Sequence, residues 1–334
     1  MDLDILCIGS ARFDIFISGK ELKPDKFSVE NNIELKNDSF YKIDHSIYEA
    51  GGSALNASIL FARQGIAAGC LARTGKDHLA NQIKIIAKHE GVQIETMVST
   101  PEHHTDINIH IVTERATEIN LGYNNSSAAL RAKDAKVSNL KSKLIYFADL
   151  PEDFRIFKYY CNWAKVNKAQ IYVNIKDFKG YKKRQVNFVL ANSNKVLVPL
   201  TLASAYFGEE NSPVEIIRQM NGIGVQSLVL YDVTSNSYAF EDDTIFMAPT
   251  YKKLNPLDMT GSEDAFAAGY VSETFQQKSV PQALTMASAN ACSVMEIFGT
   301  RIAILKKPAL RTLKVVVVVV VVVIAVVLVV VVAV

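Results

Sequence analysis

The sequence predicts an α/β domain in which helices cover both faces of a mainly parallel sheet and a second, smaller sheet projects from it. Three observations lead to this fold class. Short apolar runs alternate with segments of helical periodicity along most of the chain. Residues 28–48 and 105–121 instead alternate polar and apolar side chains. The 334 residues, 49% of them hydrophobic, are enough to bury a large core.

The elements follow one another in a regular order. Runs rich in Ile, Leu and Val predict strands at residues 3–9, 14–19, 67–74, 144–150, 170–175, 195–200 and 226–232. Apolar positions at helical spacing predict helices at residues 53–65, 77–91, 152–167, 262–277 and 281–298. A strand followed by a helix, repeated in this way, is typical of a parallel sheet covered on both faces.

The segment "TDINIHIVTERATEINL" predicts exposed antiparallel strands of the smaller sheet. Its alternation places Ile107, Ile109 and Ile111 on one face, and Asp106, Asn108 and His110 on the other. So small a sheet cannot cover its own apolar face. We expect that face to close over a ligand, pack on the main domain, or meet the same face of a second subunit.

Composition excludes several functional classes. The 36 basic and 34 acidic residues leave a net charge of +2, which gives no reason to expect nucleic acid as a partner. The one dense basic run, "KGYKKRQ" at residues 179–185, predicts a solvated helix start. The four cysteines have no C-x-x-C spacing, and the start "MDLDILCIGS" is acidic where a signal peptide needs positive charge. We therefore expect a cytoplasmic protein with reduced cysteines.

The C-terminal segment has an unusual composition. Residues 315–334 are all apolar and nearly all valine, which is about the length that spans a bilayer. The lack of Trp or Tyr at either end, and the near-single-letter composition, favour valines that stand in for residues of unknown identity over a membrane segment. We assign residues 1–312 to the folded domain and 313–334 to a valine-rich tail, and both interpretations of the tail stay open.

Two glycine-containing loops that precede predicted helices carry the candidate chemistry. In "EAGGSALNAS", Gly51 and Gly52 let a ligand approach the backbone, and Asn56 offers an amide one turn into the helix. In "DMTGSEDAFAAG", Gly261 opens the helix and Asp264 lies in its first turn, where a carboxylate can act as a general base. The first loop alone is equally consistent with an ordinary turn and helix cap, and an aspartate in a first turn, as in the second loop, is usually only a partner of the helix dipole.

Taken together, the two loops resemble those of the PfkB, or ribokinase-like, family of carbohydrate and nucleoside kinases. The resemblance covers nearly all of residues 3–305 and includes "GSARFD", "GGSALNASILFARQG", "DMTGSEDAFAAGY" and "ASANACSVMEIFGTR". The family pattern of the late motif is D-x-x-G-A-G-D, and Asp258, Gly261 and Asp264 match it. No G-x-G-x-x-G follows the first strand, and no G-x-x-x-x-G-K occurs, so neither a dinucleotide site nor a P-loop is supported.

The resemblance implies a ribokinase-like fold with a β lid at about residues 16–49 and 97–123, which many family members use to form homodimers. It implies phosphoryl transfer from ATP, with Mg2+ and with a monovalent cation as a further candidate, to a hydroxyl of a sugar or nucleoside. The implied catalytic residues are Asp264 as base and Gly261 in the anion hole. The implied substrate-binding residues are Asp14, Gly51, Gly52 and Asn56. The implied nucleotide-binding residues are Thr260, Gly261, Ser262, Asn290 and Gly299, and no residue is assigned as a metal ligand.

The chain departs from the family pattern on the nucleotide side. Glu263 replaces the glycine before the catalytic aspartate, and Leu200 and Ala203 replace the polar residues of N-x-x-E. Asp232 and Ser235 stand in a turn that the family marks with glycine. A negative charge at residue 263 should oppose phosphate binding. The alternatives are therefore a catalytically impaired member that acts as a ligand-binding or scaffold protein, or residues assigned wrongly at these positions.

Overall fold

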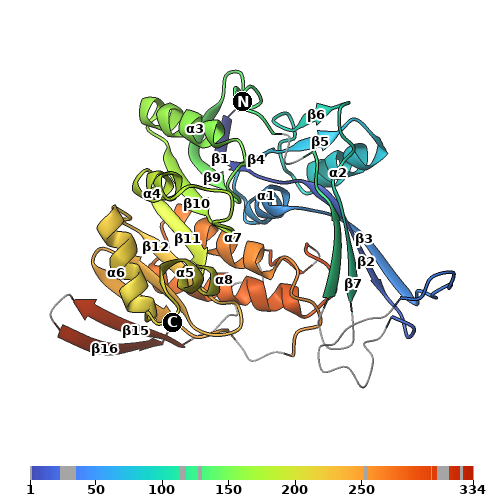
Figure 1. The fold of residues 1–334 in the computed structure, drawn as a ribbon. Coiled ribbons are helices and arrows are strands. Elements are labelled where there is room, and N and C mark those ends of the chain that lie inside the picture. The colour runs from blue at the N-terminus through green and yellow to red at the C-terminus, as the bar shows by residue number, and fades with distance from the viewer. Residues whose placement is uncertain are drawn as a thin grey trace.

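A ten-stranded sheet forms the centre of the molecule, with the strand order β16-β15-β14-β13-β12-β11-β10-β9-β1-β4 (Figure 1). The computed structural model describes residues 2–22, 35–112, 118–126, 130–251, 255–301, 303–306, 316–323 and 326–333. In this sheet β4, β1, β9, β10, β11 and β12 pair in parallel, and β13, β14, β15 and β16 pair antiparallel. The predicted fold class, a mainly parallel sheet with flanking helices and a smaller sheet, is confirmed.

The strands are β1 (Asp2–Ile8), β2 (Arg12–Ser18), β3 (His45–Gly51), β4 (Ala68–Leu71), β5 (Arg73–Gly75), β6 (Val98–Thr100), β7 (Ile107–Val112), β8 (Glu118–Tyr123), β9 (Lys141–Phe147), β10 (Gln170–Asn174), β11 (Lys195–Pro199), β12 (Leu228–Tyr231), β13 (Ser237–Glu241), β14 (Thr244–Ala248), β15 (Val316–Val323) and β16 (Val326–Ala333). The helices are α1 (Ser53–Arg63), α2 (His78–His89), α3 (Phe154–Asn167), α4 (Lys183–Ala191), α5 (Leu200–Phe207), α6 (Pro213–Ile223), α7 (Ser262–Phe275) and α8 (Val280–Met295).

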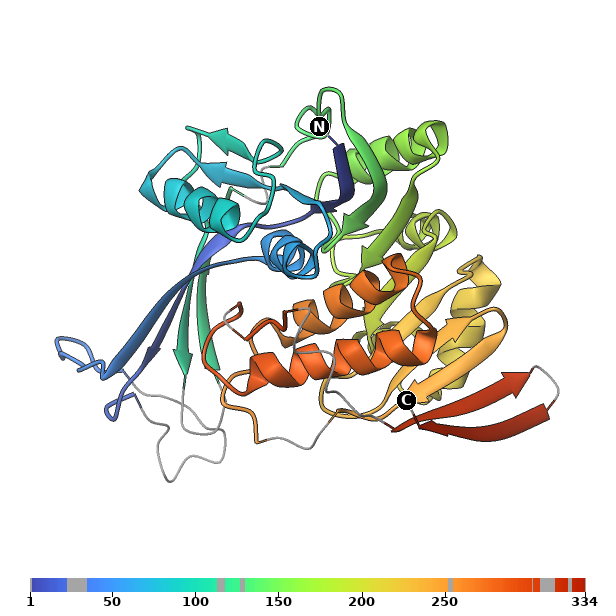
Figure 2. The same ribbon diagram turned by 180° about the vertical axis from the view of Figure 1, so that it is seen from behind.

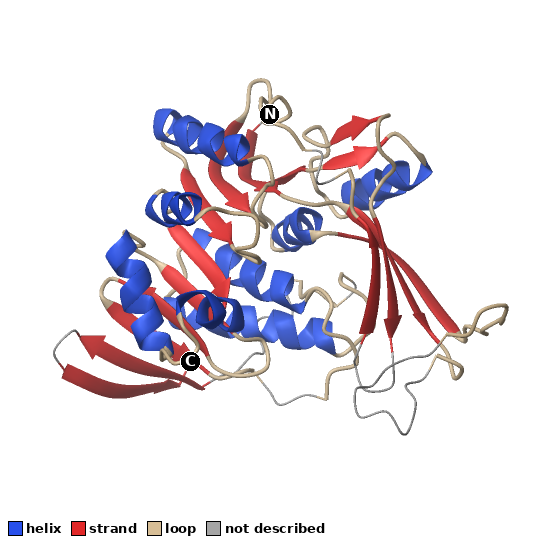
Figure 3. Cartoon of the chain, viewed as in Figure 1, coloured by secondary structure: helices blue, strands red, loops and turns tan. Residues whose placement is uncertain are grey.

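Two hydrophobic cores lie on opposite faces of this sheet. Successive side chains of a strand point to opposite faces, so on β1 Ile5 and Cys7 belong to one core while Leu6 and Ile8 belong to the other. The first core contains side chains of α1, α7 and α8, and the second those of α3, α4 and α6. Figure 2 shows α7 and α8 lying side by side, and Figure 3 shows the three layers.

The strand order reverses beside β1, and this reversal locates the candidate site. Strand β1 pairs with β4 on one side and β9 on the other, so the loops that follow β1 and β9 leave the sheet in different directions. Ligands of open α/β sheets bind outside the carboxyl ends of the strands at such a point. The loops that follow β1, β9, β10 and β12 all lie at this edge.

The smaller sheet has the strand order β3-β2-β7-β8 and projects from the main one (Figures 1 and 2). It begins at Arg12, before the expected lid boundary at residue 16, because β2 follows β1 after only a short turn. Asp14 therefore lies within β2 of this sheet. The expected lid segments also include residues 23–34 and 113–117, which lie outside the described residues.

The face of the smaller sheet that is buried is its polar one. Asn108 and His110 of β7 are 9% and 2% exposed, whereas Ile107 and Ile109 are half-buried. The alternation predicted from the sequence is present. However, the polar face of β7 lies against the rest of the molecule, whereas most of the isoleucine face does not.

The described tail residues form a β-hairpin at the edge of the main sheet. Strand β15 pairs with β14 through Met247 and Val318, and with β16 along its whole length. Every helix in the described part of the chain is too short or too polar to cross a lipid bilayer. All four cysteines are free and buried.

Candidate active site

Charged side chains gather where neighbouring strands end. Asp149 follows β9, Lys176 follows β10 and Asp232 follows β12, all at the carboxyl edge of the main sheet. The first turn of α7 adds Glu263 and Asp264 to this edge. The cluster thus contains four acidic side chains and the cation Lys176. The motif analysis included Asp264, Glu263 and Asp232 but neither Asp149 nor Lys176.

Asp264, the predicted base, is 8% exposed and its two carboxylate oxygens have different partners. The Lys176 ammonium group donates to Oδ1, and Asn56 Nδ2 donates to Oδ2 over 3.3 Å. Asn56 and Asp264 are 208 residues apart in the sequence, so the fold brings the two glycine-containing loops together. Because Asn56 Oδ1 is buried without a partner in the described structure, it remains able to accept a ligand donor.

Lys176 is a cation held among carboxylates. Burial alone would lower the pKa of its ammonium group, but Asp264 and Asp149 raise that pKa above the usual value for lysine. Burial raises the pKa of Asp149, and Lys176 opposes this shift. The carboxyl pKa of Glu263 is also raised, by removal from water and by the negative charges of Asp264 and Asp232. Lys176 therefore neutralises part of an acidic site and stays charged at neutral pH.

The turn before α7 is shaped to leave backbone N–H groups free. Gly261, the N-cap of α7, has a φ of 78°, a left-handed conformation that favours glycine. A Cβ at this position would also come within 2.9 Å of Thr300 Cβ. The first N–H groups of a helix have no partner inside it, so those of Glu263 and Asp264 can donate to an anion. Asp258 fixes this turn, because its carboxylate accepts from Thr260 N (2.9 Å) and from Gly299 N (3.1 Å).

Asp14 lies on the buried polar face of the smaller sheet. Its Oδ1 lies 2.9 Å from Arg12 Nε and 3.3 Å from His110 Nε2, while its Oδ2 is buried without a partner in the described structure. A Cβ at Gly51 would lie 1.9 Å from that Oδ2, so any other residue there would displace the carboxylate. Gly52 forms the N-cap of α1. An unpaired buried carboxylate oxygen fits a hydroxyl donor.

Glu49 is a buried acid that motif comparison did not identify. It is 1% exposed on β3, and its Oε2 accepts the Thr300 N–H over 2.8 Å. Burial raises the pKa of Glu49, although the Thr300 N–H and the Arg301 charge oppose the shift. A Cβ at Gly299 would come within 3.0 Å of the Glu49 carboxylate. The smaller sheet is thereby joined to the loop that contains Gly299, a residue that the resemblance predicts to lie near the nucleotide.

Two predicted nucleotide residues have structural contacts instead. Asn290 is fully buried in α8, where its Oδ1 accepts from Leu305 N over 3.1 Å and its amide nitrogen lies beside Gly269. The Ser262 hydroxyl donates to Met259 O over 2.7 Å, within its own turn. Both contacts are thus made within the protein's own fold. A direct role of these two side chains in binding nucleotide remains a prediction.

The departures from the family pattern have distinct local consequences. Leu200 begins α5, and Ala203 is buried in the second core. Both side chains are hydrocarbons, so neither offers a side-chain oxygen to a metal ion or a phosphate. Asp232 bonds within its own loop, because its carboxylate accepts from Thr234 N (2.8 Å) and from Ser235 Oγ (2.8 Å). A cavity of about 140 Å3 beside Asp149 is lined also by Gly9 and Asn124. The departures thus lie at residues 200, 203, 232 and 263, whereas Asp14, Gly51, Gly52 and Asn56 match the expected motif residues.

The side chains of the candidate site determine whether it can hold Mg2+. In the described residues no group of three His, Cys, Asp or Glu side chains is arranged to hold a metal ion. Mg2+ in kinases is commonly bound by one or two carboxylates together with substrate phosphates. Glu263 offers a carboxylate in the first turn of α7, whereas both carboxylate oxygens of Asp232 already accept hydrogen bonds. The residues therefore fit an ion that the nucleotide phosphates bring, but not one held by the protein alone.

Comparisons with known proteins agree with this fold. The family model for the pfkB family carbohydrate kinase matches residues 6–307. The adenosine kinase from Sinorhizobium meliloti is 18% identical, with a TM-score of 0.76 over 93% of this chain and 99% of that one. The ribokinase from Thermotoga maritima is 15% identical, with a TM-score of 0.73 over 93% and 99%. An E. coli protein described as a ribokinase II, in complex with ATP and Mg2+, is 14% identical, with a TM-score of 0.74 over 93% and 98%.

Proposed function

Because this chain belongs to the pfkB family of carbohydrate kinases, we propose that it transfers the γ-phosphoryl group of ATP to a hydroxyl of a sugar or a nucleoside. The observation that supports this most is the joint placement of Asn56 and Lys176 on the two carboxylate oxygens of Asp264. The substrate-side loop, the predicted base and a cation meet there at the open end of a helix.

The acceptor hydroxyl is positioned by the unpaired oxygens on the substrate side. Asp14 Oδ2 and Asn56 Oδ1 accept from hydroxyl groups of the substrate, which satisfies two buried acceptors that otherwise lack a donor. The reacting hydroxyl then lies near Asp264, whose carboxylate takes the proton as the new oxygen–phosphorus bond forms and the bond from the γ-phosphorus to the bridging oxygen breaks, so that ADP leaves. Arg12 and His110 hold Asp14 in place through its other oxygen.

The transferred group is stabilised by donors already in position. The N–H groups of Glu263 and Asp264 point out of the free end of α7, and the Gly261 turn leaves room for oxygen atoms beside them. Lys176 moves its hydrogen bond from Asp264 to the transferring phosphoryl oxygens, which frees one carboxylate oxygen to accept the proton. A bound Mg2+ ion, brought by the nucleotide phosphates, would supply charge neutralisation there and would offset the repulsion between the phosphates and the Glu263 carboxylate. The four free buried cysteines support a cytoplasmic location.

The rival proposal is a ligand-binding protein with little catalysis. It is favoured by one specific feature, the three carboxylates of Asp232, Glu263 and Asp264 around the position of the phosphates. Such a protein would keep the hydroxyl-binding residues Asp14 and Asn56 and bind its sugar without phosphorylating it.

A coupled assay of ADP release across a panel of pentoses, hexoses and nucleosides separates the two proposals. A kinase gives ADP release that depends on one class of acceptor and on Mg2+. A ligand-binding protein instead shows calorimetric binding of a panel member with no acceptor-dependent ADP release.

A further inference from the structure

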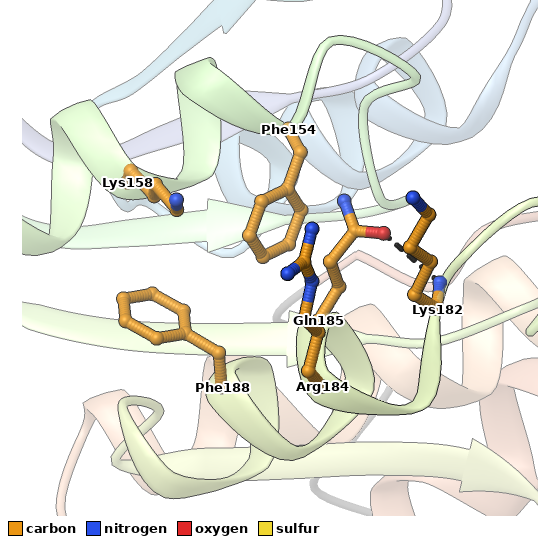
Figure 4. Close-up of a pocket in the computed structure, with 6 residues that line it drawn as sticks. All are labelled: Phe154, Lys158, Lys182, Arg184, Gln185 and Phe188. Carbon is orange, nitrogen blue, oxygen red and sulfur yellow. Dashed lines mark hydrogen bonds between the residues drawn. The ribbon is translucent and has the colours of Figure 1, made fainter.

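A second cleft, separate from the candidate active site, lies between α3 and α4 on the outer face of the sheet. It has a volume of about 440 Å3 and is lined by Phe154, Lys158, Lys182, Arg184, Gln185 and Phe188. Figure 4 shows the α3 side chains facing those of the N-terminal part of α4. None of these residues belongs to the site around Asp264, and a cleft of this volume suits a small molecule.

The polar atoms of the cleft available to a ligand are nearly all hydrogen-bond donors. Lys158, Lys182 and Arg184 are exposed cations, and no acidic side chain lines the cleft. None of the three has an ion pair with another described residue. Gln185 uses its side-chain oxygen to accept the Lys182 N–H over 2.9 Å, which leaves its amide NH2 group as a donor. Such a lining complements an anion with several acceptor oxygens.

The remaining surface of the cleft is aromatic. The rings of Phe154 and Phe188 meet edge to face with their centroids 5.9 Å apart, and both side chains are half-buried. The Lys158 ammonium group lies 5.7 Å from one ring centroid and 5.8 Å from the other. Aromatic rings prefer edge-to-face or offset contacts with another ring, and a partly exposed pair gains from covering its apolar surface. The cleft thus combines cationic groups that can bind a negative charge with an aromatic surface against which the ring of a ligand can pack.

We propose that this cleft binds a small aromatic anion, with its phosphate or carboxylate among Lys158, Lys182 and Arg184 and its ring against Phe154 and Phe188. Inorganic phosphate would use only the charged part, and a neutral ring only the apolar part. A nucleic acid fits less well, because the donors surround one bounded cleft on a chain whose net charge is only +2. This site is independent of the phosphoryl transfer proposed above.

Isothermal titration calorimetry of the full chain with phenyl phosphate tests the proposal. Phenyl phosphate should bind at least about tenfold more tightly than either inorganic phosphate or benzyl alcohol, because each of these carries only half of the recognised chemistry. Equal affinity for phenyl phosphate and inorganic phosphate would overturn the proposal, as would a lack of measurable binding.

Variants locate the binding. The double variant Lys158→Gln with Arg184→Gln should weaken phenyl phosphate binding about tenfold or more. Lys179→Gln removes an exposed charge from the same basic run outside the cleft and should leave the affinity unchanged. Phe188→Leu keeps every charge and should reduce only the preference over inorganic phosphate. Loss of binding in Lys176→Gln, with no effect of the double variant, would place the ligand at Asp264 and contradict the proposal.

Discussion

The Lys176 ammonium group donates a hydrogen bond to the Asp264 carboxylate, although the two residues are 88 positions apart in the sequence. Lys176 leaves β10 at the carboxyl edge of the sheet, and Asp264 lies in the first turn of α7 at that same edge. The side chain of Asp264 is 9% exposed and that of Lys176 is 24% exposed, so water screens the pair only partly. Asp264 is therefore held in an ion pair in this structure, and the proposed mechanism requires Lys176 to leave it for the transferring phosphoryl group.

Replacing Lys176 by Gln should lower kcat by about 100-fold or more, because a charged donor to the transition state is lost in a water-poor site. The KM for the acceptor should change much less, since Asp14 and Asn56 are untouched. Steady-state kinetics on the acceptor identified by the panel check this. Lys179→Gln, which changes an exposed lysine nearby, serves as the control. An unchanged kcat in Lys176→Gln would rule out the proposed hydrogen bond from Lys176 to the transferring phosphoryl group.

Replacing Glu263 by Gly should lower the KM for ATP by about tenfold, because one negative charge beside the phosphates is removed. Glu263→Gln keeps the size of the side chain and separates charge from bulk. Glycine in the first turn of α7 should cost at most about 1 kcal/mol of stability, so thermal unfolding is recorded for both variants. If both variants bind ATP more weakly, Glu263 is a ligand of the metal–nucleotide complex and the repulsion argument is wrong.

Asp153 should make the stability of the protein depend on pH at the acid end. Its carboxylate caps α3 and accepts from Arg155 Nε (2.8 Å) and Ala132 N (3.0 Å). The hydrogen bonds from the Arg155 side chain lower the pKa of Asp153 to about 2, because their effect outweighs that of burial, which would raise it. A pKa lowered by folding stabilises the protein above the ordinary value near 3.8, and this stabilisation is lost as pH falls toward 2.

Asp153→Asn should therefore lower the free energy of unfolding by about 1 kcal/mol at pH 7, with the difference from wild type shrinking between pH 4 and pH 2. Urea unfolding across this range measures it. A difference of constant size down to pH 2 would show that the charge of Asp153 is not the cause.

The apolar face of the smaller sheet should pair with the same face of a second subunit. Cross-strand neighbours Tyr48, Ile15, Ile109 and Leu121 form one row over all four strands. Tyr48 is 63% and Leu121 53% exposed, so the rest of the described chain leaves much of this row uncovered. Ile109→Lys should convert a dimer to a monomer in light scattering. A wild-type monomer at micromolar concentration would contradict the pairing.

Sequence reasoning identified the fold and the two motif loops, because these depend on local patterns. Periodicity marks strands and helices, and a glycine turn before a helix is visible in a short stretch such as that around Gly261. The meeting of Asn56 with Asp264 was implied only by family resemblance, since 208 residues separate them.

The residues that sequence reasoning missed acquire their roles through the order of strands in the sheet. Lys176 stands just after a predicted strand and Asp149 lies near the end of another, positions that do carry a signal, but only the strand order makes them neighbours. Glu49 precedes the Gly51 motif and gave no signal, because its partner Thr300 lies 251 residues away. The buried polar face of β7 was also unexpected, because the alternation alone does not tell which face is covered.

The most direct test of the central claim is the acceptor-dependent kcat of Asp264→Asn, with acceptor binding measured in parallel by calorimetry. If Asp264 is the base, this isosteric change should lower kcat by about 100-fold or more, since general base catalysis contributes that much, while the acceptor still binds to Asp14 and Asn56. Turnover that survives the substitution at wild-type rate would contradict the account.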